Sequence, residues 1–518
     1  MSNVSGVLGA ILGKDVRLWV HCCELHFDDA GGVLSTDEIE ILTRRSGEVI
    51  ALLMNGGDAH IAQPAAVARL PSDLIPLTFQ QESALFYREP GFCGIFSVRL
   101  RGHLNVDILS ECLARLVERH EVLRTRLVVV DGALRQQICE PPESGLTTED
   151  LTDLSESSVE EEAKGRIEIY VGRWFCEGAS TFEARLLRLG KNKSILVVPW
   201  DHMFGDQASA ILLFSELWSS YRDLCDGREP ALPQKTLIRY AEYAVWQRQS
   251  YGRWFQKHSG YWKERLAGTQ DLCLPADGQT VNNKPFSFST QNISFGKTLT
   301  AGIDELARRE RTSPALVVLT LYVTLVSLWS RQKDFLIPYY VSGRHLSRHL
   351  NVIGFFAHPL PLRIELTGDE TLAQVLRLSS QEFANASSHL DIGKSIQGIP
   401  HPFKTPFFQW FSSTPTPTDI ISDTREWNTT DMGLTVEPFP VLWRPPDDDE
   451  RRIESPILLQ LWNTNTGIVG HVFYRVDLFA PPTMEWFTSN LRRLADCIIR
   501  EPHRRILDLP LDVRPAYA

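Results

Sequence analysis

One short stretch of the chain holds the residues best suited to acid–base chemistry. Asp201, His202 and Asp206 lie close together between two apolar segments. A histidine ionises near neutral pH and can accept or release a proton, and its surroundings can shift its pKa. A loop histidine is more often a structural residue than a base, so this cluster alone supports catalysis only weakly. No second histidine or cysteine stands at metal-ligand spacing, so the cluster does not indicate a metal site.

The segments on either side indicate how the cluster is positioned. Residues 195–198 form a continuous apolar run rich in β-branched side chains, which is typical of a buried strand. Residues 208–213 are mostly apolar and predict a helix. The cluster therefore falls in a loop at the end of a buried strand, where the pKa of an ionisable group can be tuned and the group presented to a substrate.

Composition narrows the class of protein. A chain of 518 residues is too long for one ordinary hydrophobic core, so we expect about two to four structural units. The hydrophobic content of 43% and the charged content of 23% are typical of a soluble globular protein. The net charge of -11, without a basic stripe, argues against nucleic-acid binding. The nine scattered cysteines fit a reducing cytoplasm.

Neither export nor a membrane span is indicated. The N-terminus lacks a basic start, an apolar run and a cleavage site, so no signal peptide is predicted. The most apolar run, residues 314–329, falls short of about 20 residues and contains Thr320, Thr324 and Ser327, so it predicts a buried helix. We therefore expect a cytoplasmic monomer with no membrane segment.

Residues 1–54 predict a small separate unit. A short apolar helix precedes two alternating runs between residues 16 and 27, which predict a β-hairpin. Ser35 and Glu38 form a capping-box pattern at the start of a second helix. Residues 55–73 contain Gly, Ala and Pro without periodicity and predict a linker.

Several short motifs follow one another along the rest of the chain. They are PLTFQQ at 76–81, RHEVLRT at 119–125, DHMFGDQ at 201–207, YAEYAVWQ at 240–247, SGR at 342–344 with IGFFAHPLPLR at 353–363, and PFFQWF at 406–411. In this order they resemble the condensation domains of nonribosomal peptide synthesis, relatives of chloramphenicol acetyltransferase, whose signature is HHxxxDG. The hairpin and second helix of residues 1–54 resemble the β-hairpin docking domain named after tubulysin synthetase.

The resemblance implies a fold class and a way of presenting the substrate. The fold is α/β with mixed sheets, arranged as two chloramphenicol acetyltransferase-like lobes in a V-shaped pseudo-dimer, with residues 74–266 as the N-lobe and 267–518 as the C-lobe. A tunnel crosses between the lobes at His202. An acyl thioester enters it on the 4'-phosphopantetheine arm of a partner carrier protein, and no cofactor or metal is bound by the enzyme itself.

The resemblance also implies roles for single residues. His202 falls on the second His of the signature, and acts as general base or as the group that holds an amine or hydroxyl nucleophile. Asp206 forms a buried ion pair with Arg124, the second Arg of RHEVLRT. Asp201 replaces the first His of the signature and Gln207 its final Gly. Positions expected along the tunnel are His358, Gln409 and Trp410.

Two alternatives remain open at the level of sequence. Asp201, Asp206 and Ser209 match the DxxxxDxxS pattern of heterocyclization domains, which condense and then cyclodehydrate Cys, Ser or Thr. That class generally lacks the catalytic His, so His202 favours ordinary condensation. The changes at Asp201 and Gln207 also suit an inactive domain that recruits a partner, although the retention of His202 argues against it.

Partners follow from the same resemblance. The unit 1–54 is expected to bind the C-terminal tail of an upstream synthase that carries the acyl donor. Because the chain ends at Ala518, without room for adenylation, carrier or thioesterase domains, we expect transfer in trans at chain release to a small-molecule acceptor, with a hydroxyl favoured over an amine. This layout resembles the freestanding condensation enzymes that finish hybrid polyketide antibiotics such as enacyloxin. Basic residues expected to attract an acidic tail are Lys14, Arg17, Arg44 and Arg45.

Overall fold

The computed structural model describes most of the chain. The residues described are 11, 14, 17–21, 24–28, 33–44, 74–86, 93–131, 133–142, 145–155, 158–172, 182–230, 238–277, 288–344, 349–389, 405–411, 427–429, 433–439, 455–464 and 466–515. The predicted linker and, apart from Ile11, the predicted first helix lie outside them.

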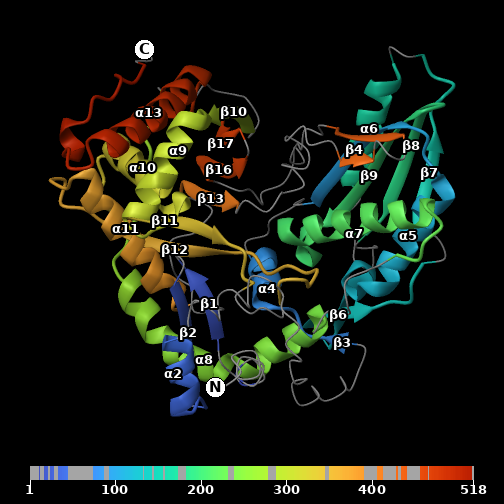
Figure 1. The fold of residues 1–518 in the computed structure, drawn as a ribbon, viewed down its shortest axis with the longest axis horizontal. Helices are drawn as coiled ribbons and strands as arrows, with labels where there is room; N and C mark the ends of the chain where they lie inside the picture. The colour runs from blue at the N-terminus through green and yellow to red at the C-terminus, as the bar shows by residue number, and fades with distance from the viewer. Residues whose placement is uncertain are drawn as a thin grey trace.

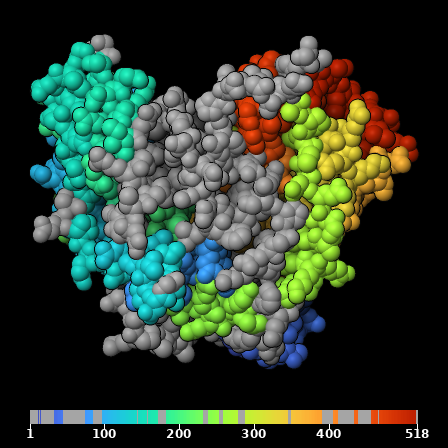
Figure 2. All heavy atoms as spheres, turned by 180° about the vertical axis from the view of Figure 1, so that it is seen from behind, coloured from blue at the N-terminus to red at the C-terminus, as the bar shows by residue number. Residues whose placement is uncertain are grey.

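The predicted two-lobe α/β architecture is confirmed. Two six-stranded sheets, each with its own helices, form the two arms of a V (Figure 1). Helix α8, Tyr240–Leu266, runs along the base of the V from one arm to the other. Seen from behind, the teal atoms of the first lobe and the red and yellow atoms of the second lie on opposite sides of the molecule (Figure 2).

The first sheet has the strand order β14-β15-β4-β9-β8-β7. On one face Leu196 of β9 packs with Leu113 and Leu217 of helices α5 and α7, and on the other Ile195 packs with Ile167 of helix α6. Side chains of a strand alternate between faces, so a strand buried on both sides is apolar throughout, as the run at 195–198 predicted. The bounds are β4 Cys93–Gly102, α5 Val106–Arg119, β7 Leu146–Asp150, α6 Val159–Gly172, β8 Ala184–Gly190, β9 Lys193–Asp201, α7 Gln207–Cys225, β14 Trp427–Thr429 and β15 Leu434–Pro438.

The second sheet has the order β10-β17-β16-β13-β11-β12, and its helices pack into one apolar core. Helix α10 is buried along nearly its whole length, which confirms the buried helix predicted over residues 314–329. Ser313 caps it by accepting a hydrogen bond from Leu316 N–H. The bounds are β10 Phe288–Ser294, α9 Gly296–Arg309, α10 Pro314–Ser330, β11 Asp334–Val341, β12 His358–Glu365, α11 Leu372–Ser387, β13 Phe407–Phe411, β16 Ile457–Thr464, β17 Gly467–Arg475, α13 Pro481–Arg500 and η6 Ile506–Asp508.

No single helix in the described part of the chain is long and apolar enough to cross a membrane. Only α9 and α10 taken together, bent by 105° where they meet, pass a test of length and composition.

Two strands change lobe. β14 and β15 come from the part of the chain expected to build the second lobe, yet β15 pairs antiparallel with β4 of the first sheet, with Leu434 opposite Gly102. An unpaired strand edge exposes a row of backbone N–H and C=O groups, so this pairing satisfies the edge of β4 and lengthens the first sheet. The predicted boundary at residue 267 therefore does not separate the two sheets completely.

Smaller elements complete the described chain. A three-stranded sheet of order β3-β6-β5 lies at the foot of the first lobe beside helix α4 (Figure 1). At the N-terminus the predicted hairpin is confirmed, and so is the capping box, since Ser35 N–H donates to Glu38 and Glu38 N–H donates to Ser35. The bounds are β1 Arg17–His21, β2 Glu24–Asp28, α2 Thr36–Arg44, β3 Leu74–Ile75, α4 Phe79–Phe86, η1 Glu121–Arg124, β5 Thr125–Val130 and β6 Ala133–Ile138.

The lobes meet closely at Gly354. The Tyr240 hydroxyl, at the start of α8, donates to the Phe355 carbonyl oxygen at 2.8 Å and lies 3.1 Å from the Thr78 hydroxyl. These contacts hold the Tyr240 ring against the backbone of Gly354, where a Cβ atom would lie 2.1 Å from Cδ2 of the ring. Only glycine fits this approach.

Gly354→Ala is therefore expected to lower the free energy of unfolding by about 1–3 kcal/mol, because overpacking forces a fixed ring to move. The matched control is Gly260→Ala in α8, where nothing lies within 4 Å of the added methyl group. That change should stabilise the helix by up to about 1 kcal/mol. Urea unfolding of both variants checks the prediction, and equal free energies of unfolding would contradict it.

Candidate functional site

The predicted cluster lies where strand β9 passes into helix α7. β9 ends at Asp201, η2 (His202–Phe204) follows, and α7 begins at Gln207. The side chain of Asp201 caps η2 by accepting a hydrogen bond from Met203 N–H at 2.9 Å. At Gly205 a Cβ atom would lie 2.1 Å from the Trp200 ring, so glycine lets the turn pack flat against the end of the strand.

Asp206 joins the two lobes. One carboxylate oxygen, Oδ1, accepts from the backbone and hydroxyl of Ser209 and caps α7. The other, Oδ2, lies 2.6 Å from Nη1 of Arg344 in the second lobe, and both side chains are only 3% exposed. Oδ2 also accepts from the N–H groups of Phe356 and Ala357 at 3.1 and 3.2 Å. A single carboxylate thus ties the end of β9 to the loop between β11 and β12.

Arg344 and Ser209 complete this network. The guanidinium of Arg344 also donates to the carbonyl oxygens of Val352 and Gly354 and to the Ser209 hydroxyl. Gly354 N–H in turn lies 2.9 Å from the same hydroxyl. Burial by itself would raise the pKa of Asp206, but Arg344 and the N–H donors hold that pKa below its ordinary value. Asp206 is therefore a permanently ionised structural carboxylate.

His202 stands beside this network. Its ring meets the ring of Phe355, from the second lobe, edge to face with centroids 4.9 Å apart. Burial lowers the pKa of His202, and the charge of Asp206 opposes that shift only in part. The imidazole is consequently neutral at pH 7, the form in which a ring nitrogen can accept a proton.

Asp201 is the second titratable group of the cluster. Burial raises its pKa to about 6, and the hydrogen bond from Met203 N–H opposes the shift. Asp201 therefore changes charge close to the neutral range, next to His202 in the chain.

The predicted partner of Asp206 is wrong. Arg124 ends η1, and its guanidinium donates to the carbonyl oxygen of Cys139, whose own N–H donates to the Arg124 carbonyl. This local pairing beside β5 and β6 uses the Arg124 side chain within the first lobe. The ion pair with Asp206 is made instead by Arg344, which stands in the SGR motif, a segment whose resemblance carried no role in the sequence analysis.

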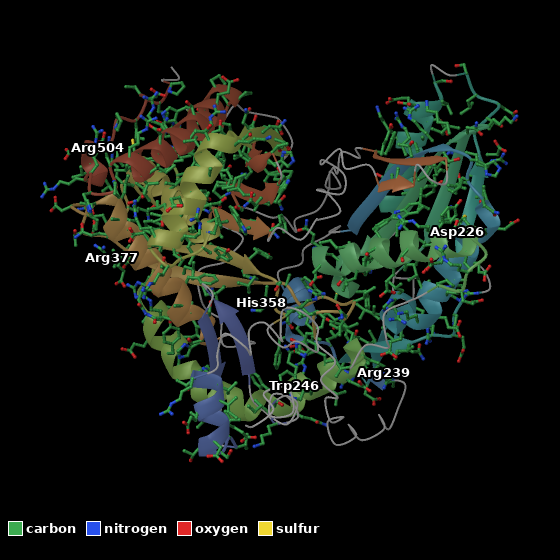
Figure 3. The ribbon with its side chains drawn as sticks, viewed as in Figure 1. Asp226, Arg239, Trp246, His358, Arg377 and Arg504 are labelled. Atoms are coloured by element: carbon green, nitrogen blue, oxygen red, sulfur yellow. The ribbon has the colours of Figure 1, made fainter. Side chains whose placement is uncertain are left out.

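The three expected tunnel residues lie in the second lobe. His358 begins β12 near the middle of the molecule (Figure 3), with its Nδ1 3.0 Å from the Phe356 carbonyl oxygen. Gln409 and Trp410 are neighbours on β13 and so point to opposite faces of the sheet. Trp410 packs against the core of the second lobe, whereas Gln409 accepts a hydrogen bond from Gln460 on β16 at 2.7 Å. Their contact with substrate stays a prediction.

The basic residues expected to dock a partner are partly engaged already. Lys14 Nζ lies 2.6 Å from Glu38, and Arg44 Nη1 lies 2.6 Å from Glu40. Arg17 stands on β1, and Arg45 lies outside the described residues. Among the residues that the structure describes, no group of three or more His, Cys, Asp or Glu side chains could hold a metal ion.

Arg344→Ala is expected to lower the free energy of unfolding by about 3–5 kcal/mol, because it leaves the Asp206 charge buried without its partner. Arg124→Ala removes a hydrogen bond to a carbonyl oxygen and should lower it by about 1–2 kcal/mol. Urea unfolding at pH 7 compares the two variants. A larger loss for Arg124→Ala would show that the buried pair does not link the lobes.

Asp201→Asn is expected to stabilise the protein in a pH-dependent way. The folded state holds a carboxyl with a pKa of about 6, above its ordinary value of 3.8, so ionisation opposes folding at high pH. Asparagine carries no charge and can still cap η2. The gain should be on the order of 1 kcal/mol at pH 8, since Asp201 is partly exposed, and should vanish as the pH falls from 6 to 4. Unfolding at pH 4, 6 and 8 tests this, and a gain that grows on acidification would refute it.

The chain is similar in sequence to known proteins along most of its length. A family model described as Condensation domain matches residues 73–511. A linear gramicidin synthase of Brevibacillus parabrevis is 28% identical over 481 residues, which cover 87% of this chain and 9% of that protein. Surfactin synthase subunit 2 of Bacillus subtilis is 25% identical over 425 residues, which cover 80% of this chain and 11% of that protein. The chain thus spans about a tenth of the length of these two relatives.

Solved structures share the fold. The X-domain from teicoplanin biosynthesis superposes with a TM-score of 0.70 at 21% identity, over 86% of this chain and 99% of that one. SgcC5 from Streptomyces globisporus superposes with a TM-score of 0.63 at 21% identity, over 83% of this chain and 100% of that one. Two lobes of this fold and a family model that matches most of its length place the chain in the condensation domain family.

Proposed function

We propose that this chain transfers an acyl group from the thioester of a carrier protein to an amine or hydroxyl acceptor, with His202 as the proton acceptor. The observation that carries the proposal is the buried, neutral imidazole of His202 at the meeting of the two lobes. Its neighbour Asp206 is committed to Arg344, so the imidazole can take up a proton while that ion pair stays intact.

The reaction follows from the chemistry of a thioester. A lone pair of the acceptor nitrogen or oxygen attacks the carbonyl carbon and forms a tetrahedral oxyanion, while a ring nitrogen of His202 accepts the proton of the nucleophile. The oxyanion then collapses, the C–S bond breaks, and the imidazolium returns the proton to the leaving thiolate of the carrier arm. General-base help of this kind accelerates such reactions by about 100- to 10,000-fold.

The family supports the nature of the donor, and a neighbour supports the acceptor. The curated relatives are synthases of gramicidin and surfactin, so a carrier-bound acyl or peptidyl donor on a phosphopantetheine arm fits this chain. SgcC5 was solved in complex with a naphthyl ethanediol, which supports testing hydroxyl acceptors as well as amines. We infer transfer in trans at chain release, in an enacyloxin-like pathway, with the hairpin unit 1–54 docking the tail of the donor synthase.

His202→Ala is expected to reduce the rate of acyl transfer by at least about 100-fold and to leave the fold intact, since the Asp206–Arg344 pair still joins the lobes. Mass spectrometry of an acyl-loaded carrier with an acceptor measures the transfer, and Gly260→Ala is the control for handling of the variants. Because the base must be neutral, the wild-type rate should fall only below about pH 6.5, the ordinary pKa of histidine. Near-normal transfer by folded His202→Ala would exclude this residue as the base.

The same assay separates the finer alternatives. Free acceptor and carrier-bound acceptor are supplied in turn, and release of product with free acceptor alone supports chain release. A product lighter by one further water molecule would indicate heterocyclization. A stable complex with the carrier and no transfer would indicate a recruitment domain, and deletion of residues 1–54 shows whether that unit lowers the carrier concentration needed.

A further inference from the structure

The turn that carries His202 is held by a second residue from outside it. Met203, which follows His202 in η2, has its N–H bonded to Asp201 and its carbonyl oxygen bonded to Nε2 of Gln81 at 2.9 Å. His202 uses its own carbonyl to accept from Gly205 N–H. The peptide groups on both sides of Met203 are therefore fixed, one from β9 and one from helix α4.

Gln81 is well placed to hold this turn rigidly. Its side chain is fully buried, at 0% exposure. Its Oε1 accepts from Thr78 N–H at 2.9 Å, and its Nε2 donates to Oε1 of Gln136 at 3.0 Å as well as to Met203. Gln136 is itself buried and donates to the Pro76 carbonyl oxygen at 2.8 Å. Both donors and the acceptor of Gln81 are thus satisfied, which leaves its amide a single orientation.

The neighbouring glutamine does something different. Gln80 is also buried, but its amide contacts the Tyr243 hydroxyl and Gln247 Nε2, both of which belong to α8. The two adjacent glutamines of α4 therefore divide their contacts, one toward the base of the V and one toward the turn with His202. A purely structural role of α4 would need only the first kind of contact.

We propose that Gln81 is a positioning residue for His202, and that its bond to the Met203 carbonyl sets where the imidazole stands between the lobes. This inference rests on the proposed function for its effect on rate, but its effect on the ring of His202 is independent of any reaction. A base displaced by about 1 Å from its productive place loses about 100-fold in rate, so the bond has a measurable consequence.

Gln81→Met keeps the length and volume of the side chain and removes its hydrogen bonds, and Gln80→Met is the matched control. We expect Gln81→Met to lower kcat for acyl transfer by about 10- to 100-fold with KM within about twofold of wild type. Gln80→Met should leave both within about twofold. Equal losses of kcat in the two variants would overturn the proposal.

The second readout is NMR of the protein labelled with 13C-histidine, with the His202 signal assigned from His202→Ala. In Gln81→Met the His202 signal should move, and its titration should shift upward toward the ordinary pKa of histidine as the turn loosens. An unchanged signal and titration would overturn the proposal, whether or not His202 proves to be the base. If Gln81→Met does not fold, Gln81→Asn retains an amide one methylene too short to reach Met203 and takes its place in both measurements.

Discussion

The arrangement of this molecule depends on one buried ion pair, between Asp206 and Arg344. The same carboxylate caps α7, accepts two backbone N–H groups of the second lobe and receives the arginine, so one charge defines the helix start and the lobe contact together. A buried ion pair repays its desolvation only when further hydrogen bonds satisfy both partners. Here Ser209 and the carbonyl groups of Val352 and Gly354 provide those bonds.

This arrangement separates the structural carboxylate from the base. In a Ser-His-Asp triad the carboxylate orients the histidine and stabilises its charged form. In this chain the oxygens of Asp206 are taken by Arg344, Ser209 and backbone N–H groups, and the His202 ring packs edge to face with Phe355. Orientation of the histidine therefore passes to its own backbone turn, which is why contacts to that turn carry mechanistic weight.

Local patterns predicted the elements well and the long-range pairings poorly. The buried strand before Asp201, the apolar helix at 314–329, the hairpin and the Ser35 capping box all rest on near neighbours in sequence, and all were found. Arg344 is 138 positions from Asp206, and no periodicity or propensity reports such a pairing. Arg124 was assigned by likeness of motif alone, and a nearer carbonyl group claims its side chain. The lobe change of β14 and β15 was missed for the same reason, since short strands take their partners from tertiary structure.

The exchange of strands between lobes also has a consequence for synthesis. Ser97 on β4 donates to the carbonyl oxygen of Phe439, 342 positions later, just after β15. A ribosome adding about 5–20 residues per second needs on the order of tens of seconds to cover that interval. During this time the nascent first lobe presents the bare edge of β4, a template for pairing with other chains. Its sheet is completed only after most of the second lobe has emerged, so the two lobes mature together and not in the order in which they are translated.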